Sequence, residues 1–148
     1  MVYSVIDVAN KFIDLAKKDN CLTNMQLQKM VYIAHGFNLA LRDTKLYYED
    51  TRAWNFGPVV PELYKELQKY GSNKVTQKIK SDNPNDKLDS GSSAIIQAVY
   101  NNYKQYSGMQ LSDLTHQDGT PWRETWGYNQ YGVIPADDIY KFYKDNHI

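Results

Sequence analysis

Apolar residues recur at helical spacing in the first third of the chain. Ser4 suits a helix N-cap, and the apolar residues that follow share one face of a 3.6-residue period. They are Val5, Val8, Ala9, Phe12 and Ala16. A second such run follows TNMQ, a capping box in which Thr23 would cap and Gln26 would reach back. Gly36 within this run predicts a close crossing with another element, because glycine in a helix otherwise costs about 1 kcal/mol relative to alanine.

The rest of the chain predicts shorter helices. Pro61 suits a first helical position, and the helix that it opens should end at Gly71. An amphipathic pattern over 95–106 predicts another helix, stopped by Gly108. Further short helices are expected at 111–114, at 120–126 and from Pro135 onward.

Little of the sequence predicts β structure. Two short aromatic pieces, 45–48 and 52–56, should be extended and lead into a glycine-proline turn. The segment 81–93 is polar and turn-rich, and is predicted to be a mobile loop. Neither side of it is long enough for a separate core. The chain is therefore predicted to form a single compact domain over 1–148, mainly α, with about six helices and a small β element.

Composition narrows the function classes. The 17 basic and 17 acidic residues balance, so no long-range field favours nucleic acid or anionic lipid, and the lysine-rich stretch 65–80 is interpreted as a solvated face. Cys21 is the only cysteine, and the N-terminus lacks a signal-peptide pattern. No apolar stretch approaches the roughly 20 residues of a membrane span. We expect a cytoplasmic protein with no membrane partner, and nucleic acid is disfavoured.

Candidate ligands for metals and cofactors are sparse. The residues that could bind zinc are His35, His116, His147 and Cys21. No two of them are close in sequence, so no metal site is expected. No glycine-rich loop of a phosphate-binding kind occurs, so no nucleotide or other cofactor is expected.

The segment LTHQDGTPW, residues 114–122, is where a histidine, an acid and hydroxyl groups come together. In a catalytic interpretation, His116 and Asp118 form an acid-base pair. In a structural interpretation, His116 closes one helix while Thr120 and Pro121 open the next. The structural interpretation is preferred, because it gives every residue of the segment a structural role.

A second segment, AWNFGPVVPELY at 53–64, has two interpretations. As structure, Gly57 supplies an unusual backbone conformation and the aromatic residues anchor a rigid turn. As function, a rigid aromatic and proline-lined ridge loses little entropy on binding. The residues expected at or supporting a partner interface are Trp54, Phe56, Pro58 and Val59.

Three blocks of the sequence, taken in order, resemble the Panacea domain family, also described as SocA-like or GepA-like phage-associated proteins. The blocks are LTNMQLQKMVYIAHGFNLAL, LYYEDTRAWNFGPVVPELYKELQKYG and LSDLTHQDGTPW. Met30 departs mildly from the family pattern, where leucine is common, and 81–93 matches no motif. The motif residues, interpreted as scaffold, are Gln28, Lys29, Tyr32, Gly57, Pro61, Tyr64, Thr115, His116, Pro121 and Trp122.

The resemblance implies a bacterial or prophage antitoxin that is not an enzyme. It would neutralise a cognate protein toxin, encoded by an adjacent gene, through direct contact, with the loop at 81–93 helping to select the partner. One alternative is a proteolytic adaptor that delivers the toxin to a AAA+ protease. Another is an enzyme that uses His116 and Asp118. A DNA-binding role is weaker, because the charge is balanced, and the sequence does not specify an oligomeric state.

Overall fold

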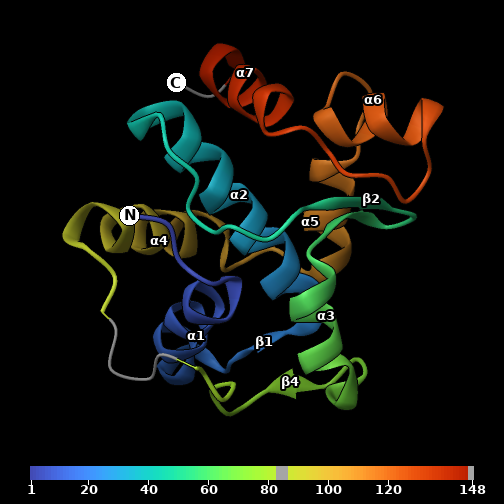
Figure 1. Cartoon of the computed structure of the whole chain (residues 1–148). Helices are drawn as coiled ribbons and strands as arrows, with labels where there is room; N and C mark the ends of the chain where they lie inside the picture. Colours follow the sequence, from blue (N-terminus) through green and yellow to red (C-terminus); the bar gives the residue numbers. More distant parts are fainter. Residues whose placement is uncertain (83–86, 147–148) are drawn as a thin grey trace.

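Figure 1 shows a computed structural model that describes residues 1–82 and 87–146. The described residues form seven α-helices, four short strands and two short 3-10 helices, which confirms a mainly α fold with a small β element. The α-helices are α1 (Val5–Ala16), α2 (Asn24–Arg42), α3 (Pro61–Leu67), α4 (Ser90–Tyr103), α5 (Gly108–Thr115), α6 (Pro121–Tyr128) and α7 (Ala136–Asn146). The strands are β1 (Leu22–Thr23), β2 (Arg52–Trp54), β3 (Gly57–Val59) and β4 (Lys74–Val75), and the 3-10 helices are η1 (Lys17–Asp19) and η2 (Gln68–Tyr70).

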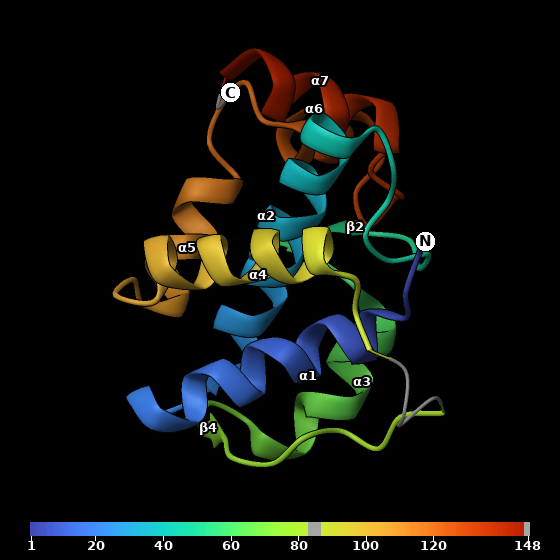
Figure 2. The ribbon, with the colours of Figure 1, turned by 90° about the vertical axis from the view of Figure 1, so that its left-hand side faces the viewer.

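Helix α2 runs through the centre of the molecule, with α1 and α4 beside it and α7 lying across its C-terminal half (Figures 1 and 2). It also contacts α3, α5, β1 and β3. The sequence pattern predicts one buried face, but the other elements cover nearly the whole helix, including the polar side chains of Gln28, Lys29 and His35. At its C-terminal end the apolar residue Leu41 is 56% exposed and does not continue the buried face.

Two of the predicted helix starts have the expected caps. The Ser4 side chain accepts a hydrogen bond from the Ile6 amide at 3.0 Å. Thr23 and Gln26 form both bonds of a capping box, at 3.2 Å and 2.8 Å. These local signals fix where α1 and α2 begin.

Some boundaries differ from the predictions. The predicted loop at 81–93 contains the start of α4 at Ser90, while its residues 83–86 lie outside the described part of the chain. Asp89 caps α4 by accepting from the Ser92 amide at 2.8 Å, and it also pairs with Arg42 at 3.2 Å. The cap itself is local, but the residues just after it are polar, so the amphipathic pattern alone placed the start too late.

The remaining differences concern β structure and one glycine. Strand β1 pairs with β4, with Leu22 opposite Val75, and this two-residue ladder was not predicted. The segment 45–48 forms only an isolated bridge, between Tyr47 and Tyr3. Gly108 was predicted to stop α4, but it is the first residue of α5. No helix within the described residues is long and apolar enough to span a bilayer.

The close crossing predicted at Gly36 is confirmed. The Tyr143 ring of α7 lies against the glycine, and a Cβ atom placed at Gly36 would be 2.3 Å from two ring carbons. Tyr143 is itself buried, and it stacks edge-on against Phe37 with ring centroids 5.0 Å apart. Glycine is therefore required where α2 and α7 cross.

Replacing Gly36 with alanine should destabilise the fold by about 1–3 kcal/mol, because the added methyl group must displace the Tyr143 ring. Urea unfolding followed by circular dichroism measures the change. Gly127→Ala in α6 is the matched control, since a Cβ there meets no atom within 4 Å. The control should be neutral or slightly stabilising; equal stability of the two variants would contradict the crossing argument.

Candidate partner-binding surface

Two polar side chains of α2 hold the second strand of the β2–β3 hairpin. The Lys29 ammonium donates a hydrogen bond to the Pro58 carbonyl at 2.9 Å. The neighbouring Gln28 accepts one from the Val60 amide at 3.0 Å. Both side chains are buried, so these bonds form away from competing water.

Side chains of α5 and α6 hold the first strand and the turn of the same hairpin. The Ser112 hydroxyl donates to the Phe56 carbonyl at 2.5 Å, and the Trp122 indole N–H donates to the Trp54 carbonyl at 2.6 Å. Together with the bonds from Gln28 and Lys29, these contacts form what we call the hairpin clasp. The clasp joins all three sequence blocks that carry the family resemblance.

Gly57 occupies a position in the clasp that other residues would resist. Its φ angle is +110°, in the left-handed region that favours glycine. A Cβ atom there would lie 3.1 Å from Lys29 Cε and 3.2 Å from Thr115 Oγ1. The Thr115 hydroxyl already donates to the Leu111 carbonyl at 2.9 Å. Gly57 is thus needed for both its backbone conformation and its close approach to α2 and α5.

The other motif residues also support the scaffold. Tyr32 is buried in α2, and its hydroxyl has no hydrogen-bond partner within the described structure. Pro61 and Pro121 begin α3 and α6. Tyr64 is 38% exposed and contacts the Trp54 ring edge-on, with centroids 5.1 Å apart.

His116 and Asp118 do not form the acid-base pair of the catalytic interpretation. Nδ1 of His116 contacts the Ser112 carbonyl, and the imidazole packs edge-on against Trp122. The Asp118 side chain is fully exposed and pairs with Arg123 at 3.6 Å. Within the described residues, His116 and Asp118 share neither a hydrogen bond nor an ion pair.

The four residues predicted at or supporting an interface divide into two kinds. Phe56 is 52% exposed at the tip of the hairpin, and Trp54 is half-buried. Pro58 and Val59 are buried, and of these two only Val59 reaches the lining of the groove described below. Of the four, Phe56 and Trp54 are available for contact.

Phe56 and Trp54 line a largely apolar groove of about 710 Å³, which we call the apolar groove. Its walls are the first turn of α2, the hairpin, the end of α3 with η2, and the start of α5. The lining residues are Thr23, Asn24, Met25, Gln28, Lys29, Trp54, Asn55, Phe56, Val59, Tyr64, Gln68, Gly71, Ser72, Ser107, Gly108 and Met109. Sequence reasoning missed Met25 and Met109, because a single methionine at a helix start has no recognisable pattern.

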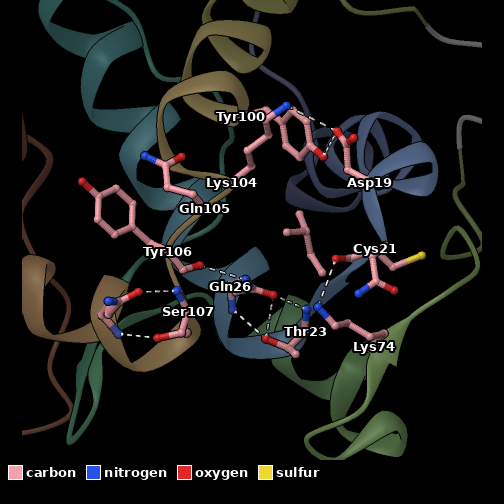
Figure 3. Close-up of a pocket in the computed structure, with 14 residues that line it drawn as sticks. Asp19, Cys21, Thr23, Gln26, Lys74, Tyr100, Lys104, Gln105, Tyr106 and Ser107 are labelled. Atoms are coloured by element: carbon pink, nitrogen blue, oxygen red, sulfur yellow. Dashed lines mark hydrogen bonds and ion pairs between the residues drawn. The ribbon is translucent and has the colours of Figure 1, made fainter.

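A second hollow of about 630 Å³, the polar cleft, adjoins this groove (Figure 3). It is lined by Asp19, Asn20, Cys21, Leu22, Thr23, Gln26, Lys74, Tyr100, Lys104, Gln105, Tyr106, Ser107, Gly108 and Gln110. Asp19 accepts a hydrogen bond from Tyr100 at 2.7 Å and pairs with Lys104 at 3.6 Å. Among the residues that the structure describes, Lys74 donates only to the Cys21 carbonyl, at 3.4 Å.

Metal binding has little geometric support in the described part of the chain. No three histidine, cysteine, aspartate or glutamate side chains come together there. His35 is buried, and its Nδ1 accepts from the Leu46 amide at 3.2 Å. The fourth candidate ligand, His147, lies outside the described residues.

Lys29 is a buried lysine without a carboxylate beside it. It is 1% exposed, and among the described residues it makes no ion pair. Burial disfavours the charged form and lowers the pKa of the Lys29 ammonium to about 7. The clasp therefore contains a group that titrates near neutral pH.

A family model described as "Antitoxin SocA-like, Panacea domain" matches residues 27–123. The chain is also similar to a protein named Antitoxin SocA from Caulobacter vibrioides (strain NA1000 / CB15N), with 31% identity over 128 residues. That alignment covers 78% of this chain and 66% of the relative, so the chain spans just under two thirds of the relative's length. No solved structure matches the chain.

The lowered pKa of Lys29 predicts that stability rises with pH. The unfolded chain, with a lysine pKa of about 10.4, binds more protons than the folded chain between about pH 7 and pH 10. The free energy of unfolding should therefore increase over this interval. Above about pH 10 it should fall, because burial raises the pKa of Tyr32, Tyr47 and Tyr143 in the folded state.

Urea unfolding at a series of pH values between about 7.5 and 9.5 measures this slope. Lys29→Met should largely remove it, because methionine has a similar length and cannot bind a proton. Lys141→Met, at an exposed position on α7, should retain the wild-type slope. A slope that survives in Lys29→Met would assign the titration to another group.

Proposed function

The chain belongs to the SocA-like antitoxin family with a Panacea domain, and we propose that it is the antitoxin of a toxin-antitoxin pair. In this proposal it neutralises a cognate toxin in the cytoplasm by direct protein-protein binding. The toxin would be encoded by an adjacent gene. Family membership is the observation that carries the proposal.

The apolar groove supports a binding function. Exposed apolar surface gathered at one place is typical of a protein-protein interaction site. Phe56 of the hairpin and Met109 of α5 are 52% and 53% exposed, and Trp54 and Tyr64 also line the groove. Large side chains of this kind contribute much of the free energy of protein interfaces.

The hairpin clasp supports the same proposal through rigidity. The Phe56 carbonyl is bonded to Ser112 of α5, and the Trp54 carbonyl to Trp122 of α6. The backbone that carries both aromatic side chains is therefore fixed before a partner arrives. A preorganised surface loses less conformational entropy on binding than a flexible loop.

An enzymatic function has less support. The family favours a non-enzymatic role. Of the acid-base pair in the catalytic interpretation, Asp118 is exposed and forms an ion pair with Arg123, and His116 packs against Trp122. A neutralising protein requires a surface and no catalytic centre.

Co-expression with the toxic product of a neighbouring reading frame should restore growth of a host strain. The two proteins should also elute together from a size-exclusion column. Asp118→Asn should neutralise as well as the wild type, because the Asp118 side chain is fully exposed and forms its ion pair with Arg123 at the surface. Failure of the wild-type chain to rescue growth with any neighbour would count decisively against the proposal.

Toxin abundance in the same cultures separates two modes of neutralisation. Blocking by direct binding leaves the toxin level unchanged while growth recovers. Delivery to a AAA+ protease, the alternative mode, lowers the toxin level in cells that contain the protease and not in cells that lack it. Loss of rescue in Asp118→Asn would instead support an enzyme.

A further inference from the structure

We propose that the apolar groove and the polar cleft form one continuous docking surface for a single segment of the toxin. That segment carries apolar side chains at one end and at least one aspartate or glutamate beside them. The inference rests on the proposed function, since it assumes a protein toxin as partner, and it specifies the chemistry that the antitoxin recognises.

The two hollows share three lining residues, Thr23, Ser107 and Gly108. Thr23 is the N-cap of α2 and Ser107 is the N-cap of α5. Figure 3 shows Thr23 and Ser107 along one edge of the polar cleft, with Gln26 between them. Gln26 donates to the Tyr106 carbonyl at 2.9 Å and so ties the two helix starts together. A segment that leaves the apolar groove therefore passes directly into the polar cleft.

The apolar groove provides the anchor for the nonpolar end of this segment. Phe56 and Met109 face solvent over about half of their surfaces, at 52% and 53%. Met25 packs under the start of α5, where a Cβ at Gly108 would lie 2.9 Å from Met25 Cβ. Burying such side chains against a partner removes apolar surface from water at roughly 25 cal/mol per Å².

The charge of the groove favours an acidic neighbour for the anchor. No aspartate or glutamate lines the groove, so no negative charge there would repel a carboxylate; its one lysine, Lys29, is buried and bonded to the Pro58 carbonyl. The first two residues of α2 and of α5 also line the groove, and the amides of a first helical turn have no intrahelical acceptor. Both helix N-termini therefore present positive partial charge at the junction of the two hollows.

The polar cleft extends this positive surface. Asp19 is its acidic residue, and it is already bonded to Tyr100 and Lys104. Lys74 has no acidic partner among the described residues and bonds only to a carbonyl. A carboxylate on the toxin would find an unneutralised lysine here, whereas a basic segment would be repelled.

Charge reversal and polar substitution at the two hollows test the proposal. Met109→Glu places a charge in the apolar anchor site, and Lys74→Glu reverses the charge in the cleft. Each should weaken binding to the purified neighbouring toxin about tenfold or more in calorimetry. Raising the salt from about 50 mM to about 500 mM should weaken the wild type more than Lys74→Glu.

Two substitutions serve as matched controls, because both residues are exposed outside the two hollows. Leu41→Glu corresponds to Met109→Glu, and Lys141→Glu corresponds to Lys74→Glu. Both controls should bind the toxin as the wild type does. Circular dichroism and urea unfolding of all four variants show whether each remains folded. We expect all four variants to remain folded, because the substituted side chains are exposed.

A photo-crosslinking residue at Phe56 and another at Gln105, in separate proteins, identify the bound toxin segment by mass spectrometry. Both should label the same segment, and that segment should contain an aspartate or glutamate. Labelling of two separate segments, or of one without an acidic side chain, overturns the inference.

The outcomes also separate this inference from the proposed function. If the wild type neutralises the toxin but Met109→Glu and Lys74→Glu do so equally well, the antitoxin function stands and the docking surface is wrong. If the wild type neither binds nor neutralises any neighbouring product, the proposed function itself fails.

Discussion

The hydrogen bonds of the β2–β3 hairpin are the constraint on which the arrangement of this protein depends. A hairpin with three residues in each strand is at best marginally stable alone. Here side chains from three helices supply partners for its backbone: Gln28 and Lys29 come from the first block of sequence, and Ser112 and Trp122 from the third. The carbonyls of Trp54, Phe56 and Pro58 would otherwise lose hydrogen bonds to water without replacement.

Lys29 illustrates the energetic compromise within this clasp. Its burial costs free energy because the ammonium leaves water without gaining a carboxylate. An apolar residue would avoid that cost but would leave the Pro58 carbonyl without its donor. The long Lys29 side chain also restricts which residues fit at position 57. A Cβ atom at Gly57 would lie so close to Lys29 Cε that the lysine would have to move. The lysine of the first block and the glycine of the second therefore depend on one another.

The sequence predicted those parts of the fold that depend on interactions between residues close together in the chain. The sequence predicted the helical periodicity and the Thr23–Gln26 capping box because both depend on residues close together in sequence. It predicted the close α2–α7 crossing because a glycine inside a helix destabilises that helix unless another element packs against it. The start of α4 was missed although its Asp89 cap is also local, because the first turn is polar and looks like a continuation of the turn-rich segment 81–93.

Surface features of the candidate site were harder to predict for a related reason. The sequence drew attention to Trp54 and Phe56, which do border the groove. Met25 and Met109 contribute to it only because the starts of α2 and α5 pack together. Strand β1 escaped prediction because a two-residue ladder carries no periodicity and depends wholly on the distant β4. Tertiary packing, and not residue type, creates these parts of the surface.

The structure also separates the groups that maintain the scaffold from those that a partner can touch. The side chains of Gln28 and Lys29 point toward the hairpin and form hydrogen bonds with its backbone. Met109 and Ser72 line the apolar groove and take part in none of the clasp bonds. A change at either of these two positions alters the groove wall while the clasp stays intact. Recognition can therefore vary without loss of the fold, whereas a change at Lys29 must alter both.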